Sequence, residues 1–135
     1  MKPAKVLFVC VENSCRSQMA EGFARALGPG ALEPWSAGSR PSGTVNPRAI
    51  EFMREKGVEL GKSASKSLAD VPQSGWDFVV TMGCGEACPF VAAKKKEDWA
   101  LPDPKNLPPE EFREVRDAIE AKVRALIESV RQGAF

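Results

Sequence analysis

Short apolar runs separated by turn residues predict four β-strands. They are expected over residues 5–9, 32–36, 78–82 and 98–101. The run from Val6 to Val9 is continuously apolar, as in a strand that is buried on both faces of a parallel sheet. Pro34 lies inside the second run, and because proline cannot donate to a ladder of hydrogen bonds, it favours an edge position for that strand.

Between these runs, apolar residues recur every three or four positions, which predicts amphipathic helices. Met19, Phe23 and Leu27 share one face of the first helix, which Gly28 and the proline after it should end. The second helix is expected to begin after an N-cap at residue 46, with proline at its first position, and to end at residue 57, a glycine.

The last part of the chain predicts one long helix. Its apolar stripe consists of Phe112, Val115, Ile119, Val123, Leu126 and Val130. We interpret this stripe as a packing surface. Two smaller features are also expected: Ser65 should cap a short helical turn over residues 66–69, and the Pro-Asp-Pro segment at 102–104 should be a loop.

Strands that alternate with helices predict the fold class. We expect a small doubly wound α/β fold, with a parallel four-stranded sheet in the flavodoxin-like order 2-1-3-4 and helices on both faces. A chain of 135 residues, 43% of them hydrophobic, suits one domain over residues 1–135. Such sheets keep their sites at the carboxyl ends of the strands, so functional residues are expected at that edge.

Charge and composition narrow the classes of function. The 19 basic and 18 acidic residues give a net charge of +1, which favours neither nucleic acid nor an anionic membrane as a partner. The lysine cluster at 94–96 is interpreted as a solvated turn. The chain shows no charged-then-apolar leader and no long apolar run, so we expect a cytoplasmic protein, and we expect it to be a monomer.

The chain contains neither histidine nor tyrosine. Cys/His dyads and Ser/His/Asp triads are therefore excluded, and a general acid must be a carboxylic acid, a lysine or a cysteine. Four cysteines without an export signal favour catalytic, redox or metal-binding roles over structural disulfides. A zinc site made of Cys10, Cys15, Cys84 and Cys88 would have looser spacing than a zinc knuckle, so we expect no metal and no cofactor.

The segment from Cys10 to Ser17, CVENSCRS, joins the first predicted strand directly to the first helix. Its backbone N–H groups and the helix N-terminus can point at one concavity, and Arg16 adds a fork that suits a tetrahedral anion. The expected anion-binding residues are Val11, Glu12, Asn13, Ser14, Cys15 and Arg16. The alternative interpretation is a buried cysteine in an ordinary strand-to-helix turn.

Cys10 is the expected nucleophile of this segment. Helix N-termini and nearby cations favour the thiolate form of a cysteine, so Cys10 should be ionised at neutral pH. Ser17 is placed to donate a hydrogen bond to the sulfur and hold its charge. Asn13 tolerates the left-handed backbone that a tight anion-binding turn requires. These residues together predict nucleophilic chemistry on an oxyanion.

The sequence CVENSCRSQMAEG at residues 10–22 resembles the active-site signature of the thioredoxin-coupled arsenate reductases, which share the fold of the low-molecular-weight protein tyrosine phosphatases. The resemblance continues through residues 35–38, 45–47, 77–81, 88–89 and 103–104. It favours the reductase branch, since Gln18 follows Ser17 where the phosphatases usually carry proline. Arsenate or phosphate is the implied ligand, and thioredoxin or a similar thiol reductant is the implied partner.

The resemblance also implies roles for three residues outside this segment. Asp103 lies between two prolines that stiffen its loop, and it matches the family's general acid, although an isolated Asp-Pro would more often be a turn aspartate. Cys84 and Cys88 match the family's two redox cysteines. Cys84 would form a disulfide with Cys10 and release arsenite, and Cys88 would carry the oxidation to a Cys84–Cys88 disulfide.

Two departures from the family pattern affect these expectations. Well-known members separate the redox cysteines by six residues, whereas only residues 85–87 intervene here, so Cys88 is the less secure thiol and a glutaredoxin-like or small-thiol donor stays open. Some members also bind a monovalent cation. Asn13, Glu21 and Ser36 match its ligands, but Lys66 replaces an expected aspartate. We therefore predict that an ammonium replaces potassium, and we expect Cys15 to be a buried residue pointing away from the anion.

Two other functions remain as alternatives. A low-molecular-weight phosphatase would need Cys10, Arg16 and Asp103 but no second cysteine. That family usually carries aromatic residues after its Asp-Pro, where this chain has lysine and asparagine, so we expect only side phosphatase activity. A sensing module that stops at the disulfide is the third interpretation.

Overall fold

Four parallel strands form the centre of the protein. The computed structural model describes residues 2–61, 63–83 and 91–133. Within them the strands are β1 (Ala4–Cys10), β2 (Leu32–Gly38), β3 (Phe78–Thr81) and β4 (Lys95–Asp98). They pair in the order β2-β1-β3-β4, and every pair is parallel. The predicted order is confirmed, as is the edge position of the strand that contains Pro34.

The fourth strand lies three residues earlier than predicted. All of its side chains are exposed, so no apolar run marks it in the sequence. Its position follows from backbone pairing with β3, in which Lys95 is the partner of Phe78 and Asp98 the partner of Thr81. The prediction of a strand over 98–101 is therefore wrong, and so is the prediction of a turn at 94–96, because Lys95 and Lys96 belong to β4.

Three α-helices and two short 3-10 helices complete the described fold. They are α1 (Arg16–Leu27), α2 (Pro47–Arg54), α3 (Pro109–Arg131), η1 (Leu68–Asp70) and η3 (Pro104–Asn106). Asn46 caps α2 as predicted, since its side chain accepts a 2.8 Å hydrogen bond from the Arg48 amide. The helix ends at Arg54, and Gly57 then takes a left-handed φ of 75°.

Ser65 does not cap the short turn that follows α2. The N-cap of η1 is Ser67, which shares a capping box with Asp70. The Ser65 hydroxyl instead donates a 2.9 Å hydrogen bond to the carbonyl of Glu12. A hydroxyl that could satisfy either a helix end or a neighbouring loop is used here for the loop.

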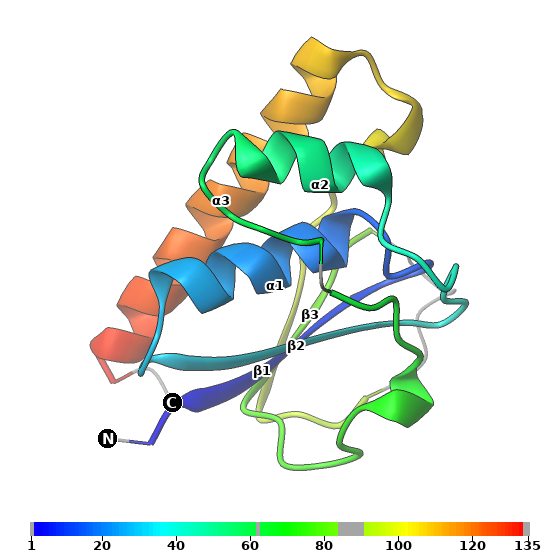
Figure 1. Ribbon diagram of the computed structural model, residues 1–135. Helices are drawn as coiled ribbons and strands as arrows, with labels where there is room; N and C mark the ends of the chain where they lie inside the picture. The colour runs from blue at the N-terminus through cyan, green and yellow to red at the C-terminus, as the bar shows by residue number, and fades with distance from the viewer. Residues whose placement is uncertain (1, 62, 84–90, 134–135) are drawn as a thin grey trace.

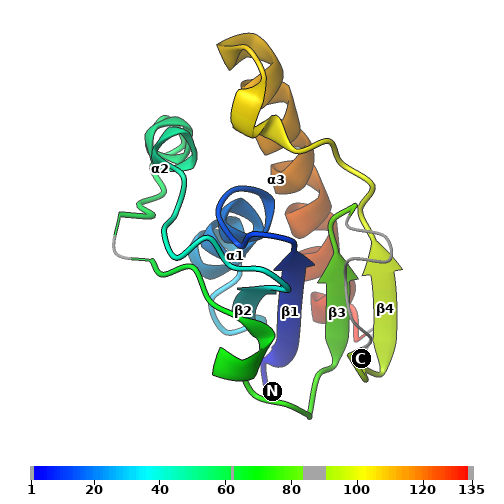
Figure 2. The same cartoon turned by 90° about the vertical axis from the view of Figure 1, so that its right-hand side faces the viewer.

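The α-helices lie together on one face of the sheet, with α1 between the sheet and α2 (Figure 1). Figure 2 shows η1 and its flanking loops on the other side. The main core lies between the sheet, α1 and α3, and α2 joins it through the tilted rings of Phe52 and Phe112, whose centres are 4.7 Å apart. A smaller core, centred on Leu7, Val79 and Trp76, covers the second face. Helices were predicted on both faces of the sheet. Among the described residues, the helix that lies on this second face is the 3-10 turn η1.

The sheet topology places the functional segments. The carboxyl ends of β1 and β3 are adjacent, since Val9 pairs with Thr81 and the Met82 amide donates to the Val9 carbonyl at 3.0 Å. The chain leaving β4 returns to the same edge through residues 99–107 before α3 begins. None of the helices in the described part of the chain is long and apolar enough to span a membrane.

Candidate active site

Residues 11–15, which we name the anion loop, form a ring between β1 and α1. Each of their carbonyl groups accepts a hydrogen bond from outside the ring, and the donors are the amides of Arg40, Ser42, Asn46 and Met19 and the side chain of Gln18. A peptide group that points its carbonyl outward directs its N–H inward. The loop therefore presents N–H groups to a common centre next to the N-terminus of α1.

Asn13 makes this ring possible. Its φ is 50°, and it is the non-glycine residue with positive φ in the described structure, which confirms the predicted left-handed conformation. The side chain is fully buried, and its Oδ1 accepts hydrogen bonds from the Lys66 amide at 2.7 Å and from Nε2 of Gln18 at 2.9 Å. These bonds fix the amide orientation, so Nδ2 is the atom that faces Ser17.

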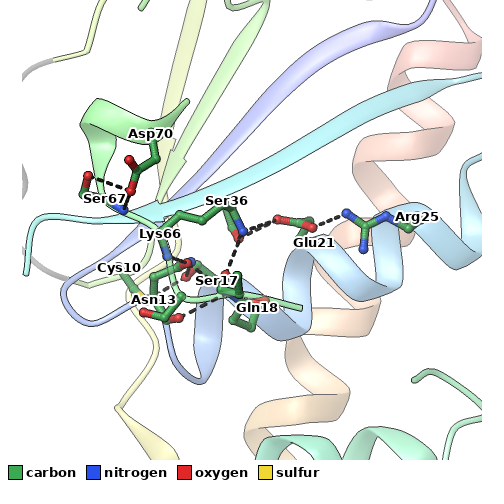
Figure 3. Close-up of polar contacts among 12 residues, drawn as sticks. Cys10, Asn13, Ser17, Gln18, Glu21, Arg25, Ser36, Lys66, Ser67 and Asp70 are labelled. Atoms are coloured by element: carbon green, nitrogen blue, oxygen red, sulfur yellow. Dashed lines mark hydrogen bonds and ion pairs between the residues drawn. The ribbon is translucent and has the colours of Figure 1, made fainter. Parts of the chain in front are cut away.

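A chain of hydrogen bonds leads from Asn13 to the sulfur of Cys10 (Figure 3). Nδ2 of Asn13 donates to Oγ of Ser17 at 2.7 Å, and that oxygen lies 2.8 Å from Sγ of Cys10. Because an amide nitrogen can only donate, the Ser17 oxygen accepts from Asn13 and its own proton is free to point at the sulfur. A donor aimed at the sulfur stabilises the thiolate over the thiol.

The pocket above Cys10 has a volume of about 230 Å³. It is lined by Cys10, Val11, Glu12, Ser14, Cys15, Arg16 and Asp103. The structure thus brings together Cys10, the predicted anion-binding residues that line the pocket, and the predicted general acid, across about 90 residues of sequence. Asn13 and Ser17 are not among the lining residues, but they form the hydrogen-bonded chain that ends at the Cys10 sulfur.

Arg16 is buried at the edge of the pocket. Its Nη1 donates to the carbonyl of Met82 and, at 2.9 Å, to the carbonyl of Leu101. The guanidinium thereby joins the end of β3 to the segment that leads to Asp103. With five N–H donors, it keeps others for an anion while these two bonds hold its plane.

Asp103 is an exposed residue that caps η3. Its Oδ1 accepts a 3.1 Å hydrogen bond from the Lys105 amide, and the Lys105 ammonium reaches across to the Glu12 carboxylate at 2.9 Å. The Pro-Asp-Pro segment is a loop up to residue 103, as predicted, and becomes a 3-10 turn from Pro104. Only the tertiary structure shows that Glu12 and Lys105 meet.

Cys15 is buried, as predicted, but it also borders the pocket. Burial, together with electrostatic interaction with the nearby Asp103 and Cys10, raises the pKa of the Cys15 thiol to about 12. Cys15 is therefore protonated at neutral pH and is a poor nucleophile, since the thiolate is the reactive form. Its expected non-catalytic character fits this environment, whereas the expectation that it points away from the pocket does not.

The ammonium of Lys66 lies beside Glu21 and Ser36, as expected if it replaces the monovalent cation that some family members bind. Its Nζ lies 3.6 Å from Oε1 of Glu21 and 3.5 Å from Oγ of Ser36, and the Ser36 hydroxyl donates to the same carboxylate oxygen at 2.5 Å (Figure 3). Arg25 pairs with the other oxygen of Glu21. The described residues contain no group of three or more acidic, histidine or cysteine side chains that could hold a metal ion.

Gly38 is a functional residue that sequence reasoning missed. A Cβ atom at this position would lie 2.5 Å from the carbonyl oxygen of Val11 and 2.9 Å from the amide nitrogen of Asn13. Only glycine permits β2 to approach the anion loop so closely. The residue stands in the Trp-Ser-Ala-Gly stretch that carried the family resemblance, which was the available signal.

Cys84 and Cys88, the two predicted redox cysteines, lie outside the described residues. The structure does place Gly83, the residue before Cys84, beside Arg16: a Cβ on Gly83 would lie 3.2 Å from Nη1 of that side chain. Strands β1 and β3 are parallel, which confirms the arrangement on which the prediction depended. Gly83 therefore lies at the sheet edge that carries Cys10.

Comparisons with known proteins agree with this geometry. Residues 5–134 match the family described as low molecular weight phosphotyrosine protein phosphatase. A glutaredoxin arsenate reductase of Synechocystis sp. is 40% identical over 129 residues, which cover 93% of this chain and 98% of that protein.

Solved structures give the same result. An arsenate reductase in the phosphate binding state has a TM-score of 0.87 and 41% identity, covering 96% of this chain and 99% of that one. A thioredoxin-dependent arsenate reductase of Corynebacterium glutamicum has a TM-score of 0.79 and 30% identity, covering 97% of this chain and 63% of that one. The chain therefore belongs to the low molecular weight phosphotyrosine protein phosphatase family, in which it groups with the arsenate reductases.

Proposed function

We propose that this protein is an arsenate reductase that converts arsenate to arsenite through Cys10 and a cysteine disulfide relay. The observation that carries the proposal is the hydrogen-bonded chain from Asn13 through Ser17 to the Cys10 sulfur, at the base of a ring of inward N–H groups. A packing cysteine needs no such donor. A nucleophile for an oxyanion needs both the thiolate and the ring.

The first step is attack on arsenate. The Cys10 thiolate forms an S–As bond, one As–O bond breaks, and Asp103 protonates the oxygen that leaves as water. Arg16 and the N–H groups of the anion loop neutralise the charge on the remaining oxygens. The product is a thiol-arsenate adduct in which arsenic is still As(V).

The second step is the reduction. The Cys84 thiolate attacks the Cys10 sulfur, so that an S–S bond forms, the S–As bond breaks, and its electron pair stays on arsenic, which leaves as arsenite. Cys88 then attacks Cys84 and frees Cys10. The Cys84–Cys88 disulfide is reduced by an external dithiol, which supplies the two electrons that arsenic took up.

Thioredoxin and a glutaredoxin-type donor are both candidates for the external reductant. One relative carries glutaredoxin in its name, and a solved relative is thioredoxin-dependent. The short spacing between the two redox cysteines keeps the glutaredoxin system in consideration. We expect a monomer in either case, which light scattering of the purified protein measures.

Side hydrolysis of phosphate esters is the second activity we expect. Arsenate and phosphate share shape and charge, and the family includes phosphatases. The described residues that line the pocket include no aromatic ring, so none of them can stack on the ring of a phosphotyrosine. Aryl phosphates should therefore be hydrolysed slowly.

The test is arsenate-dependent oxidation of NADPH, run with thioredoxin and its reductase and, in parallel, with glutathione, glutathione reductase and glutaredoxin. The variants are Cys10→Ser, Cys84→Ser and Cys88→Ser. We expect no turnover with the first two, while Cys84→Ser retains aryl phosphate hydrolysis. Equal arsenate turnover in wild type and Cys84→Ser would contradict the relay and favour the phosphatase.

A further inference from the structure

Residues 99–107, the loop that carries Asp103, are held by hydrogen bonds from Arg48, a residue of α2. The Arg48 guanidinium donates to the carbonyl of Lys105 at 2.8 Å and to the carbonyl of Leu107 at 2.5 Å. Both acceptors belong to the main chain. Arg48 therefore fixes the path of the backbone two to four residues after Asp103, whatever the side chains there do.

Arg48 is itself held in place by two aromatic rings. Its guanidinium carbon lies 5.0 Å from the ring centre of Phe112 and 5.7 Å from that of Phe52. Both rings belong to the main core, so the planar fork rests on a rigid surface. The loop is thus tied to the packed contact between α2 and α3.

The loop also has apolar anchors, since Pro104 is buried and Leu101 and Leu107 pack against the main core. Its other polar contacts are weaker or belong to the site itself. Lys105 pairs with Glu12, but both side chains are more than a third exposed, and such ion pairs contribute little. Asp103 holds its own turn through the Lys105 amide, and Arg16 donates a hydrogen bond to the loop at Leu101. To these contacts Arg48 adds two hydrogen bonds from outside the loop, both to backbone just after Asp103.

We propose that Arg48 is a positioning residue for Asp103. The inference rests on the proposed function, because it takes Asp103 as the acid that protonates the leaving oxygen. Without Arg48 the turn would relax away from the pocket, and a displacement of about 1 Å is enough to cost roughly a hundredfold in rate. Oxyanion binding, which depends on the anion loop and Arg16, would be preserved.

The test compares variants that separate the hydrogen bonds of Arg48 from its packing on the two rings. Arg48→Met removes the donors but keeps an unbranched side chain over the rings, and Arg48→Lys restores a single donor group in place of the planar fork. Arg113→Met is the matched control, because Arg113 also covers the Phe52 ring, at 4.9 Å, and pairs with Glu55 but makes no described contact with the Asp103 loop. Thermal unfolding of each variant checks that it is folded.

The decisive measurement is a double-mutant cycle between Arg48→Met and Asp103→Asn, in kcat for arsenate reduction and for phenyl phosphate hydrolysis. We expect Arg48→Met to lower kcat by about tenfold or more in the wild-type background and to have little further effect beside Asp103→Asn. The Kd for phosphate should stay near the wild-type value. Arg48→Lys should recover part of the loss, and Arg113→Met should show none.

Three results would overturn the inference: the same loss in both backgrounds, a similar loss in Arg113→Met, or an unchanged kcat in Arg48→Met. A wild-type protein that turns over no arsenate would instead refute the proposed function. The cycle would then be read in phenyl phosphate hydrolysis alone, where the poor leaving group still requires the acid. The two failures are therefore distinguishable.

Discussion

The hydroxyl oxygen of Ser17 lies 2.8 Å from the sulfur of Cys10, and because this oxygen accepts a hydrogen bond from Asn13, its own proton is free to point at the sulfur. Ser17→Ala removes this donor. A hydrogen bond to a charged group contributes about 1.5–3 kcal/mol, so we expect the alkylation of Cys10 by iodoacetamide at pH 7 to slow by about tenfold or more. Peptide mass spectrometry measures the rate at Cys10, and Ser74→Ala, distant from the site, is the control. An unchanged rate would show that the hydroxyl does not support the thiolate.

Gly38→Ala should disable the anion loop without unfolding the protein. The added Cβ would meet backbone atoms of Val11 and Asn13 at 2.5 and 2.9 Å, and backbone cannot move aside as a flexible side chain can. We expect a loss of about 1–3 kcal/mol in the free energy of unfolding and a large loss of phosphate affinity, measured by urea denaturation and calorimetry. Gly61→Ala is the control, since its Cβ would meet the ends of the Glu59 and Arg54 side chains and no backbone among its nearest atoms. Retained phosphate affinity in Gly38→Ala would contradict this role.

Potassium should not activate this protein. The Lys66 ammonium already lies beside Glu21 and Ser36, the two residues that match the family's monovalent-cation ligands. Replacing sodium by potassium at constant ionic strength should change neither kcat nor the melting temperature. If potassium clearly raises both, the substitution of ammonium for the ion is refuted.

Lys66→Ala gives the complementary experiment. It leaves the buried Glu21 carboxylate with Arg25 and Ser36 as its partners, and we expect a loss of about 1–3 kcal/mol in the free energy of unfolding. Arg40→Ala, which removes a basic side chain elsewhere, should cost much less. A Lys66→Ala protein as stable as wild type would show that the ammonium does not balance Glu21.

Glu55 should make stability depend on acid pH. Hydrogen bonds from Arg113 and Arg116 lower the pKa of its carboxyl from 4.5 to about 2 in the folded protein. The depressed folded-state pKa means that the stabilisation is present above about pH 4.5 and is lost as the pH falls toward 2. The stability difference between wild type and Glu55→Gln should therefore be constant from pH 5 to 7 and shrink at lower pH. Urea denaturation across this range measures it, with Glu114→Gln as a control, and a difference that does not change below pH 4.5 would contradict the assignment.

Much of the candidate site was predictable because it is local in sequence. Cys10, Asn13, Arg16 and Ser17 lie within one strand-to-helix connection, and the type and order of these residues predict its conformation. Asp103 was predictable only as a residue type in a stiff loop, and its approach to Cys10 required the fold. Cys84 and Cys88 stay predictions.

The sequence by itself determined the helices, the buried strands and the anion loop, since these depend on periodicity, caps and turn residues that are neighbours in the chain. Tertiary structure alone decided the exposed strand β4, the fit of Gly38 against the loop, and the pairing of Glu12 with Lys105, which are 93 residues apart. The physical reason is that such contacts depend on how packed elements bring distant backbone and charges together, and residues that do not bury apolar surface leave no pattern from which this can be inferred.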